Sequence, residues 1–446
     1  MAKRRISISR FEELTKGYTM ADAIQEAKRC LNCKKPLCVE GCPVEHDIHG
    51  FIHQLSMGNL GAALQIISEK SSLPAICGRV CPHEKQCEGH CILNKKGSPV
   101  RSGRLERFVA DFDSEMKLIK ERLKAKDRGK VAVIGSGPAG LTVAGDLAKE
   151  GFNVLVFESQ NELGGVLLYG IPEYRLPNEI VHREIKRIES LGVSFMTNYI
   201  IGDKVTIDDL FDHGFDAVFI GSGTSLPKQL NIPGTDLYRV VQSFYFLRMV
   251  SLFNEGSINR SAVPLISGEN VAVIGAGNVA MDTARTAIRM GAESVTIIYY
   301  KGESAISALK SEYHEAIKEG VKFLWNTNTL EFIGKKNKLE SVRIQKADSE
   351  RIIPVDRVFV AVGSRPANRI VSTSKGIDVD DRGYVITKPS PYGMTTRRGI
   401  FAGGDVVHTP QTVVLAMREA KLVAKGIAQY VDALKLLNHC WALIPI

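Results

Sequence analysis

One supersecondary unit occurs twice in this chain of 446 residues, and it restricts the fold more than any other feature. Each copy has a short apolar strand (131–134 and 271–274), a turn of the form G-x-G-x-x-G/A, a helix and a second apolar strand. The backbone of such a turn comes close to a pyrophosphate, and the helix that follows points its positive end at the phosphates. The sequence therefore predicts an α/β protein with two dinucleotide-binding domains.

The glycines of each turn have separate tasks. The first permits the tight bend, the second lets the backbone approach the ligand, and the third, which is alanine in the second copy, lets the helix pack on the strand. The residues expected to contact a dinucleotide are Gly135, Gly137, Pro138, Ala139 and Gly140 in the first copy, and Gly275, Gly277, Asn278, Val279 and Ala280 in the second.

The strand that follows each helix ends differently in the two copies. Glu158 ends the first one, where a carboxylate can accept hydrogen bonds from the adenosine ribose of FAD or NAD. Tyr299, Tyr300 and Lys301 occupy that place in the second copy. Lys301 would attract a 2′-phosphate that an acid would repel, which favours NADPH over NADH. A lysine on a solvated loop explains Lys301 equally well, so NADH stays open.

Eight of the nine cysteines lie between residues 30 and 91, in two runs of four. The spacings C-x2-C-x4-C-x3-C-P and C-x3-C-P-x4-C-x3-C are too irregular for a zinc ribbon. Clustered cysteines in a reducing compartment bind metal more often than they form disulfides, and eight cysteines suit two 4Fe-4S clusters. Each run could hold its own cluster, or the runs could share ligands, because the cysteine before proline ligates the other cluster in two-cluster ferredoxins.

The composition excludes several classes of protein. No apolar run reaches the roughly 18 residues of a membrane helix, and no apolar h-region of a secretory signal follows the basic start. Lysine and arginine, which give the net charge of +9, are spread along the chain without a basic block, so nucleic acid is not an expected partner. We expect a cytoplasmic protein whose positive surface is simply solvated, or attracts phosphorylated cofactors or an acidic redox partner.

The C-terminal region has the features of a flavin site. Asp405 follows an apolar strand and can accept hydrogen bonds from ribityl hydroxyls. Thr409 and Pro410 are expected to open the last helix as its N-cap and first residue. That helix would direct the amides near Thr412 and Val413 at the flavin pyrimidine oxygen, where a positive helix end stabilises the anionic reduced flavin. An ordinary strand, turn and helix is the alternative.

Five stretches together give the chain a specific resemblance. Residues 20 to the end resemble the small-subunit family of NADPH-dependent glutamate synthase, which also includes the N-terminal half of dihydropyrimidine dehydrogenase and the large subunit of NADH-dependent ferredoxin:NADP oxidoreductase. The stretches are the cysteine runs, Gly103–Phe108, Gly164–Pro172, Gly277–Asp282 and Ala402–Asp405.

This resemblance implies an architecture and a set of cofactors. An N-terminal α-helical iron–sulfur domain (1–125) would precede two Rossmann-like domains, with the NAD(P)H-binding domain (241–364) inserted into the FAD-binding domain (128–240 and 365–446). The first glycine turn would bind FAD, with Gly165 among its contacts, and the second would bind NADPH. The segment 168–174 would either wall the flavin or belong to the core.

The resemblance also implies that the two cysteine runs share their cluster ligands. Cys77 would be a spare, small buried thiol. From its chemistry alone, Glu106 could equally be a cluster ligand or a surface residue in a salt bridge. Only its Leu-Glu-Arg-Phe context favours the ligand. The implied ligands are Cys30, Cys33, Cys38 and Cys91 for one 4Fe-4S cluster, and Cys42, Cys81, Cys87 and the non-cysteine ligand Glu106 for the other.

The expected function is electron transfer. The dinucleotide-binding domains contain no cysteine before Cys440, which excludes reduction of a disulfide at the flavin. Hydride from NADPH would reach FAD, and single electrons would leave through the clusters to a larger catalytic subunit or a ferredoxin-like carrier. No side-chain acid or base is expected to be catalytic, because the cofactors carry the chemistry.

Three alternatives to a glutamate-synthase small chain stay open. Two are a subunit of ferredoxin:NADP oxidoreductase, which the segment 171–177 slightly favours, and a subunit of a dihydropyrimidine dehydrogenase. The third is a non-catalytic assembly subunit. It rests on the segments 300–301 and 306–308, which read Tyr-Lys and Ile-Ser-Ala where the family usually has an Arg pair and Met-Pro-Ala.

Overall fold

The computed structural model describes residues 11–116, 124–367, 369–410 and 412–442. Within these residues, no helix combines the length and the hydropathy needed to cross a bilayer. The chain packs into two compact units. The small unit comprises the described residues of Met1–Leu14, Val166–Pro177 and Pro227–Ser364, and the large unit comprises those of Thr15–Gly165, Asn178–Leu226 and Arg365–Ile446.

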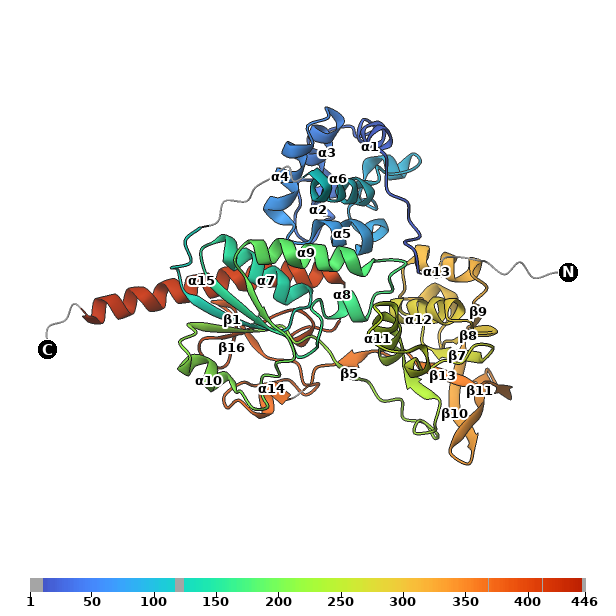
Figure 1. The fold of residues 1–446 in the computed structure, drawn as a ribbon. Helices are drawn as coiled ribbons and strands as arrows, with labels where there is room; N and C mark the ends of the chain where they lie inside the picture. Colours follow the sequence, from blue (N-terminus) through green and yellow to red (C-terminus); the bar gives the residue numbers. More distant parts are fainter. Residues whose placement is uncertain (1–10, 117–123, 368, 411, 443–446) are drawn as a thin grey trace. The chain divides into compact units, whose positions relative to one another are not determined.

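The cysteine-bearing region of the large unit is made of short helices (Figure 1). Thr19 caps the first helix through a capping box with Asp22, and Pro74 opens α5. Phe51 and Leu55 are among the buried side chains that hold these helices together. The elements are α1 (Met20–Ala27), α2 (Leu37–Glu40), α3 (Ile48–Ser56), α4 (Leu60–Lys70), α5 (Pro74–Val80), η1 (His83–Lys85), η2 (Ile92–Lys95) and α6 (Ser102–Met116).

The rest of the large unit is built on a seven-stranded sheet of order β15-β16-β17-β4-β1-β2-β3. Strand β1 lies between β2 and β4 and is parallel to both, the arrangement that places a ligand at its carboxyl end. The strands are β1 (Lys130–Ile134), β2 (Asn153–Phe157), β3 (Ser194–Met196), β4 (Ala217–Ile220), β15 (Thr387–Pro389), β16 (Tyr392–Thr395) and β17 (Ile400–Ala402). The helices are α7 (Pro138–Lys149), α9 (Asn178–Ser190), α10 (Ile207–Asp212), α14 (Arg369–Ser372), η5 (Gly404–Val406) and α15 (Val413–Ala442).

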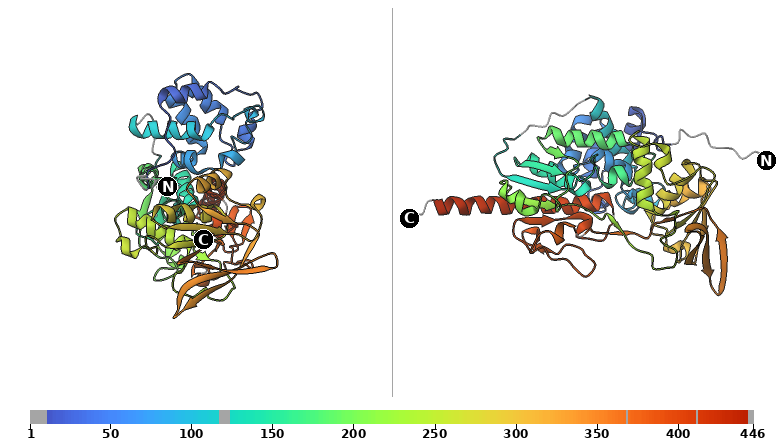
Figure 2. Two further views of the ribbon diagram at one scale, coloured as in Figure 1. Left: turned by 90° about the vertical axis from the view of Figure 1, so that its right-hand side faces the viewer. Right: turned by 60° about the horizontal axis from the view of Figure 1, so that its bottom comes forward.

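The small unit is built on a five-stranded parallel sheet of order β6-β13-β7-β8-β9, and a three-stranded antiparallel sheet adjoins it (Figure 2). The strands are β6 (Val240–Gln242), β7 (Asn270–Ile274), β8 (Ser294–Ile298), β9 (Lys322–Leu324), β13 (Arg357–Val360), and the antiparallel β10 (Thr327–Lys335), β11 (Lys338–Lys346) and β12 (Ser349–Pro354). The helices are α8 (Val166–Tyr169), α11 (Ser243–Asn254), η3 (Arg260–Ala262), α12 (Asn278–Arg289), η4 (Glu303–Ala305) and α13 (Lys310–Lys318). The short strands β5 (Leu226–Pro227) and β14 (Ser364–Arg365) pair where the chain passes from one unit to the other.

Both predicted strand–turn–helix–strand copies are confirmed, as β1-α7-β2 and β7-α12-β8. The expected start of the last helix is wrong. Helix α15 begins at Val413, and the hydroxyl of Thr412 accepts a hydrogen bond from the Leu415 amide at 3.4 Å. Thr412, rather than Thr409, therefore supplies the N-cap oxygen, and Pro410 lies before the helix.

The segment Val166–Pro177 packs within the small unit, although the sequence around it builds the large one. The Tyr174 ring is 1% exposed, and the guanidinium groups of Arg285 and Arg289 lie 4.8 and 3.9 Å from its centroid. Arg175 donates to both carboxylate oxygens of Asp282, each at 2.8 Å. The sequence left open whether the segment 168–174 lines the flavin or belongs to the core. Tyr174 belongs to the core.

Candidate cofactor sites

The first glycine turn has the shape that a pyrophosphate site needs. Gly135 has φ +101°, and a Cβ there would lie 2.6 Å from the Gly221 carbonyl oxygen. A Cβ at Gly140 would lie 1.9 Å from the Gly135 carbonyl oxygen, so the helix can pack this closely on the turn only without a side chain. At Gly137, by contrast, a Cβ would meet nothing within 4 Å. The turn is thus closed on its protein side and open where a ligand would lie, in front of Pro138 at the start of α7.

Glu158 holds the surroundings of this turn together. Its buried carboxylate accepts hydrogen bonds from the Ser136 amide at 3.0 Å, from the Ser136 hydroxyl at 2.6 Å and from the Gln160 amide at 2.9 Å. The Ser136 hydroxyl in turn accepts a bond from the Gly164 amide at 3.0 Å. One carboxylate therefore connects the glycine turn, the end of β2 and the loop at 164–165.

Two further glycines bring distant segments against the turn. Gly165 has φ +55°, and a Cβ there would lie 3.0 Å from the Gly137 α-carbon. Gly404 has φ +76°, and a Cβ there would lie 3.0 Å from the Ala139 Cβ. Asp405 is the next residue, in η5 directly after β17. The structure thus gathers these predicted flavin contacts at the carboxyl end of the large sheet.

The second glycine turn repeats the geometry in the small unit. Gly275 has φ +120°, and a Cβ there would lie 2.5 Å from the Ala361 carbonyl oxygen. Around Gly277 the nearest atom to an added Cβ is the Ser307 hydroxyl oxygen, at 3.5 Å, so this turn too is open at its second glycine. The Asn278 side chain accepts a bond from the Leu309 amide at 2.9 Å, which fixes the helix start. Val279 and Ala280 follow in α12, exposed and buried respectively.

Glu158 directly follows β2, and Tyr299 holds the corresponding position after β8, with Lys301 two residues further along the chain. Its side chain is exposed, with the ammonium nitrogen 5.2 Å from the Tyr300 ring centroid, and it forms no ion pair with any other described residue. A cation in this position is available to a 2′-phosphate.

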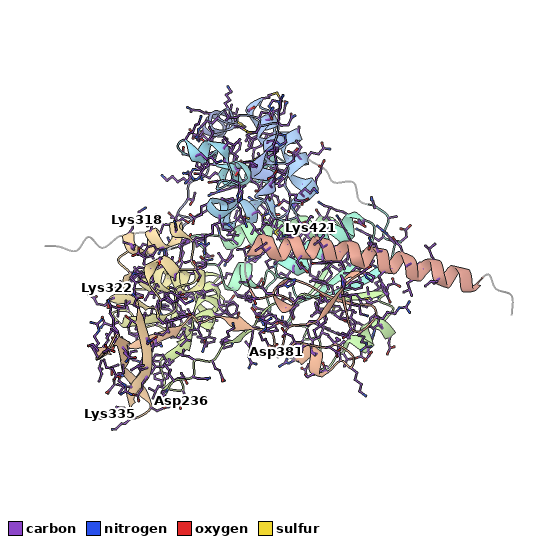
Figure 3. The ribbon with its side chains drawn as sticks, turned by 180° about the vertical axis from the view of Figure 1, so that it is seen from behind. Asp236, Lys318, Lys322, Lys335, Asp381 and Lys421 are labelled. Atoms are coloured by element: carbon purple, nitrogen blue, oxygen red, sulfur yellow. The ribbon has the colours of Figure 1, made fainter. Side chains whose placement is uncertain are left out.

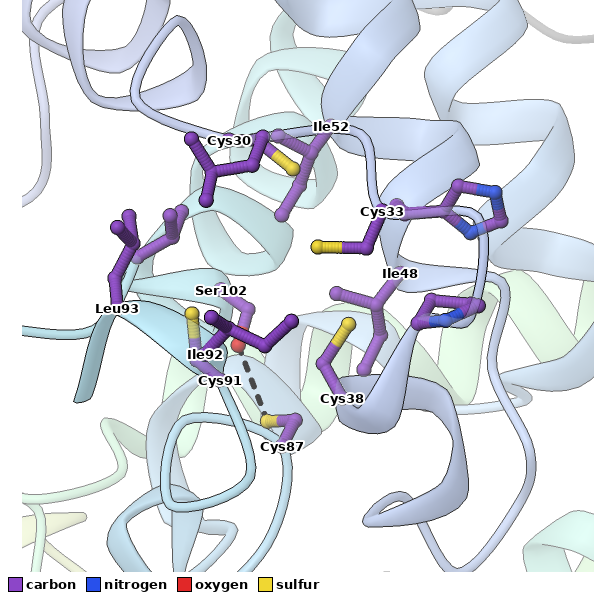
Figure 4. A pocket seen from close by; sticks show the side chains of 14 residues that line it. Cys30, Cys33, Cys38, Ile48, Ile52, Cys87, Cys91, Ile92, Leu93 and Ser102 are labelled. Carbon is purple, nitrogen blue, oxygen red and sulfur yellow. Dashed lines mark hydrogen bonds between the residues drawn. The ribbon is translucent and has the colours of Figure 1, made fainter. Parts of the chain in front are cut away.

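Four cysteines from both runs line one pocket in the helical region. Figure 4 shows the sulfur atoms of Cys30, Cys33, Cys38 and Cys91 around a common space. Cys87 also lines this pocket, but its sulfur accepts a hydrogen bond from the Ser102 hydroxyl at 3.1 Å. The structure therefore brings a cysteine of the second run together with three of the first.

The protein surroundings of this pocket do not favour thiolates. Burial raises the pKa of the Cys38 thiol to about 11, and the neighbouring thiols of Cys30 and Cys91 add to the effect. Burial likewise raises the pKa of Cys30. A metal must supply the positive charge that makes these thiols ionise, because metal binding replaces their protons.

A second group of side chains surrounds Cys81. Contact with Cys77 and burial raise the pKa of Cys81 well above its ordinary value, and the charges of Glu106 and Cys87 contribute. Burial raises the pKa of Cys42 to about 11, with Glu106 and Cys77 again among the causes. Cys42, Cys77, Cys81, Cys87 and Glu106 thus lie close enough together for their charges to affect one another.

Glu106 is a buried acid rather than a surface residue. It is 9% exposed, and burial raises its pKa to about 8. Nδ1 of His46 lies 3.9 Å from the Glu106 carboxylate, and burial lowers the pKa of His46 to about 4. The salt-bridge alternative thus lacks a permanent cation, whereas a metal ligand would account for a carboxylate buried among cysteines.

The cysteine groups fit an iron–sulfur cluster better than a single ion. No three His, Cys, Asp or Glu side chains among the described residues come close enough together to hold one metal ion. Each cysteine of a 4Fe-4S cluster binds a different iron, so its ligands stand farther apart than the ligands of one zinc ion.

Three residues of these sites were not expected from the sequence. Ser136 and Ser102 contact Glu158 and Cys87, and Met417 receives a hydrogen bond from the Cys77 thiol at 3.5 Å. A polar residue inside the glycine turn could have drawn attention to Ser136. Ser102 and Met417 carry no such signal, because only tertiary packing brings them to the cysteines.

Two family models match the chain. Residues 7–118 match "Dihydroprymidine dehydrogenase domain II, 4Fe-4S cluster", and residues 129–420 match "Pyridine nucleotide-disulphide oxidoreductase". Among solved structures, thioredoxin reductase of Lactococcus lactis covers 68% of this chain and 99% of its own, with 25% identity and a TM-score of 0.54. FprA of Mycobacterium tuberculosis in complex with NADPH shares the fold, with 19% identity over 69% of this chain and 85% of its own and a TM-score of 0.57.

Relatives of known sequence match almost the whole chain. The glutamate synthase [NADPH] small chain of Halomonas elongata is 34% identical over 96% of this chain and 95% of its own length. The corresponding protein of Escherichia coli K12 is 33% identical over 95% and 94%. The NAD-dependent dihydropyrimidine dehydrogenase subunit PreT of Escherichia coli O157:H7 is 32% identical over 94% and 97%. The chain therefore belongs to the glutamate synthase small-chain family and is an iron–sulfur flavoprotein oxidoreductase.

Proposed function

We propose that the chain accepts hydride from NADPH at the second glycine turn and delivers single electrons to a partner through two 4Fe-4S clusters. FAD, when bound at the first glycine turn, supplies the conversion between two-electron and one-electron chemistry. The protein binds and orients the cofactors, and no side chain needs to act as an acid or a base.

One contact carries this proposal. The Cys77 thiol lies 3.5 Å from the Met417 sulfur in the first turns of α15, the helix whose start is expected to face the flavin. Cys77 also touches Cys81 of the second cysteine group. This group therefore lies against the helix of the expected flavin site, which supports electron exit through the clusters. The stretch 129–420 contains no cysteine, so a disulfide offers no competing exit there.

The proposed cofactor sites follow from the two cysteine groups and the two turns. The helical iron–sulfur domain would span 1–125, and the NAD(P)H-binding domain (241–364) would interrupt an FAD-binding domain of 128–240 and 365–446. One cluster would be bound by Cys30, Cys33, Cys38 and Cys91, and the other by Cys42, Cys81, Cys87 and Glu106. FAD would contact Gly135, Gly137, Pro138, Ala139, Gly140, Glu158, Gly165, Asp405, Thr412 and Val413, and NADPH would contact Gly275, Gly277, Asn278, Val279, Ala280 and Lys301.

NADPH is proposed over NADH because of Lys301. The names of the relatives include both NADPH and NAD, so sequence similarity alone does not distinguish the two coenzymes. An exposed lysine without an ion pair among the described residues, two positions beyond the place where NAD-binding domains carry an acid, offers a 2′-phosphate a partner.

The electron acceptor is proposed to be a larger partner subunit, as in glutamate synthase. Several relatives are named as a small chain or as a subunit, which supports a multi-subunit assembly. A cytoplasmic location is proposed because unpaired clustered cysteines suit a reducing compartment.

Anaerobic titration of the purified holoprotein with NADPH tests the proposal. We expect NADPH to bleach the flavin absorbance and electron paramagnetic resonance to detect reduced clusters afterwards. A Cys38→Ser variant should keep the flavin bleaching and lose one cluster signal. A holoprotein whose flavin NADPH does not bleach would instead be a non-catalytic assembly subunit.

A further inference from the structure

The pocket of Cys30, Cys33, Cys38 and Cys91 opens at the protein surface. All four cysteines are partly exposed, as are Cys42 and Cys81 of the other group, whereas Cys77 and Cys87 are buried. Leu31 and Ile92 line the same pocket and are 60% and 37% exposed, and Ile92 is labelled in Figure 4. Two large apolar side chains thus stand in solvent at the mouth of the pocket.

The segments that form this mouth are strongly basic. Residues 28–40 and 92–104 contain eight lysines and arginines but a single acid, Glu40. These 26 residues hold an excess of seven positive charges, and Glu26 and Glu88, which lie outside them, pair with Arg29 and Arg101 at 2.6 and 3.1 Å and reduce the excess to five. Neither segment is a basic block by itself, but together they gather positive charge beside the cysteines.

Most of the lysines on this rim have no acidic neighbour. Lys34, Lys95 and Lys96 are exposed and form no ion pair with any described residue, and Lys35 approaches Glu40 only to 3.8 Å. Arg29 joins the two segments into one rim, since its guanidinium donates to the carbonyl oxygens of residues 98 and 99 at 2.7 and 3.3 Å. The rim therefore presents positive charge to solvent, around an apolar centre.

We propose that this rim is the docking surface for an acidic protein that receives the electrons, with Leu31 and Ile92 at the centre of the contact. The inference rests on the proposed function, because it assigns the partner of the same cluster. An apolar centre within a charged rim is the usual anatomy of an interface between proteins, and opposite charge accelerates encounter and fixes orientation. Docking here would bring the partner's redox group directly over the pocket.

The experiment measures binding of the intact holoprotein to a ferredoxin of strongly negative net charge, used as the probe. The rim variant combines Lys34→Glu, Lys35→Glu, Lys95→Glu and Lys96→Glu. Its matched control changes four exposed lysines of the small unit and alters the net charge equally. The control substitutions are Lys322→Glu, Lys335→Glu, Lys338→Glu and Lys346→Glu, and Figure 3 shows the first two positions.

Surface plasmon resonance at low ionic strength should show a Kd at least about tenfold weaker for the rim variant and at most about threefold weaker for the control. Added salt should reduce this difference, because the rim charges are exposed. If ferredoxin binding weakened equally in both variants, net charge alone would explain the effect and the proposal would be overturned. A mixed-sequence oligonucleotide that displaces the ferredoxin at equal concentration would also overturn it, since the rim would then bind any polyanion.

Flavin bleaching by NADPH separates this proposal from the function on which it rests. Neither set of lysines belongs to the cofactor sites, so both variants should bleach at the native rate. If the native holoprotein fails to bleach, the proposed function fails, whereas a rim variant that bleaches normally and binds the ferredoxin as well as the native protein refutes only the docking surface.

Discussion

Replacing Glu158 by glutamine tests the first glycine turn most sharply. The carboxylate accepts four hydrogen bonds, two at each oxygen, from the Ser136 amide and hydroxyl, the Ser159 hydroxyl and the Gln160 amide. An amide nitrogen cannot accept, so Glu158→Gln loses two of the four bonds. At about 1.5 kcal/mol or more for each bond to a charged group, the loss is about 3 kcal/mol. That lowers Tm by roughly 6–12 °C for a domain of this size.

FAD binding should weaken as well, because a ribose hydroxyl would take the place of the longest of these bonds, from the Ser159 hydroxyl at 3.2 Å, and the substitution removes the charge that accepts it. Loss of one charged hydrogen bond, about 1.5 kcal/mol, raises the Kd for FAD about tenfold. Calorimetry of the FAD-free protein measures the first effect, and flavin fluorescence during titration of that protein measures the second.

Ser136→Ala is the matched control for this substitution. It removes the hydroxyl contacts with Glu158 and Gly164 but keeps the carboxylate, so stability should fall while FAD affinity stays within about threefold. A Glu158→Gln protein that binds FAD as tightly as the native chain would refute the assignment of this carboxylate to the ribose.

Three other outcomes follow from named contacts. Asp282→Ala removes both bonds of the buried Arg175 Nη1 but leaves its 3.2 Å ion pair with Glu312, so the unfolding free energy should fall by about 1.5–3 kcal/mol in urea titrations; a loss below about 0.5 kcal/mol would contradict the buried pair. Lys301→Glu should raise the KM for NADPH about tenfold or more relative to that for NADH, and an unchanged ratio of kcat/KM values would argue for the solvated loop. In chelator-treated apoprotein, burial raises the pKa of Cys42 from 9.0 to about 11, so the folded state keeps a proton that the unfolded state loses. The Cys42 contribution to stability should therefore fall by up to about 2.7 kcal/mol between pH 9 and pH 11, in addition to that of the other buried thiols, and a Cys42→Ala protein with the same pH slope as the native chain would contradict this.

The sequence carried enough information for the two sheets because their turns are local. Gly135 and Gly275 must adopt positive φ directly after a buried strand, and no distant contact is needed to recognise that pattern. The start of α15 was predicted wrongly for a similar reason. Thr409 and Pro410 form a good local N-cap pair, but Thr412 is a competing cap three residues later, and tertiary packing decides between them.

The cysteine groups required tertiary information. Spacing alone left open whether each run holds its own cluster, since Cys91 is separated from Cys30 by 61 positions of chain. Packing of the short helices puts both in one pocket. The burial of Glu106 also could not be predicted from the sequence, because a glutamate in an amphipathic helix faces solvent more often than the core. The positive charge beside the pocket of Cys30, Cys33, Cys38 and Cys91 could not be predicted either, because the two basic segments that supply it are far apart in the sequence.

The iron content of a Cys77→Ala holoprotein tests the central claim, that seven cysteines and Glu106 hold two shared clusters. Cys77 is buried and its thiol contacts Met417, so its removal should cost some stability but no cluster ligand. We predict about eight iron atoms per chain, as in the native protein, for two complete 4Fe-4S clusters. A value near four iron atoms would contradict the account, because it would make Cys77 a ligand in place of Glu106.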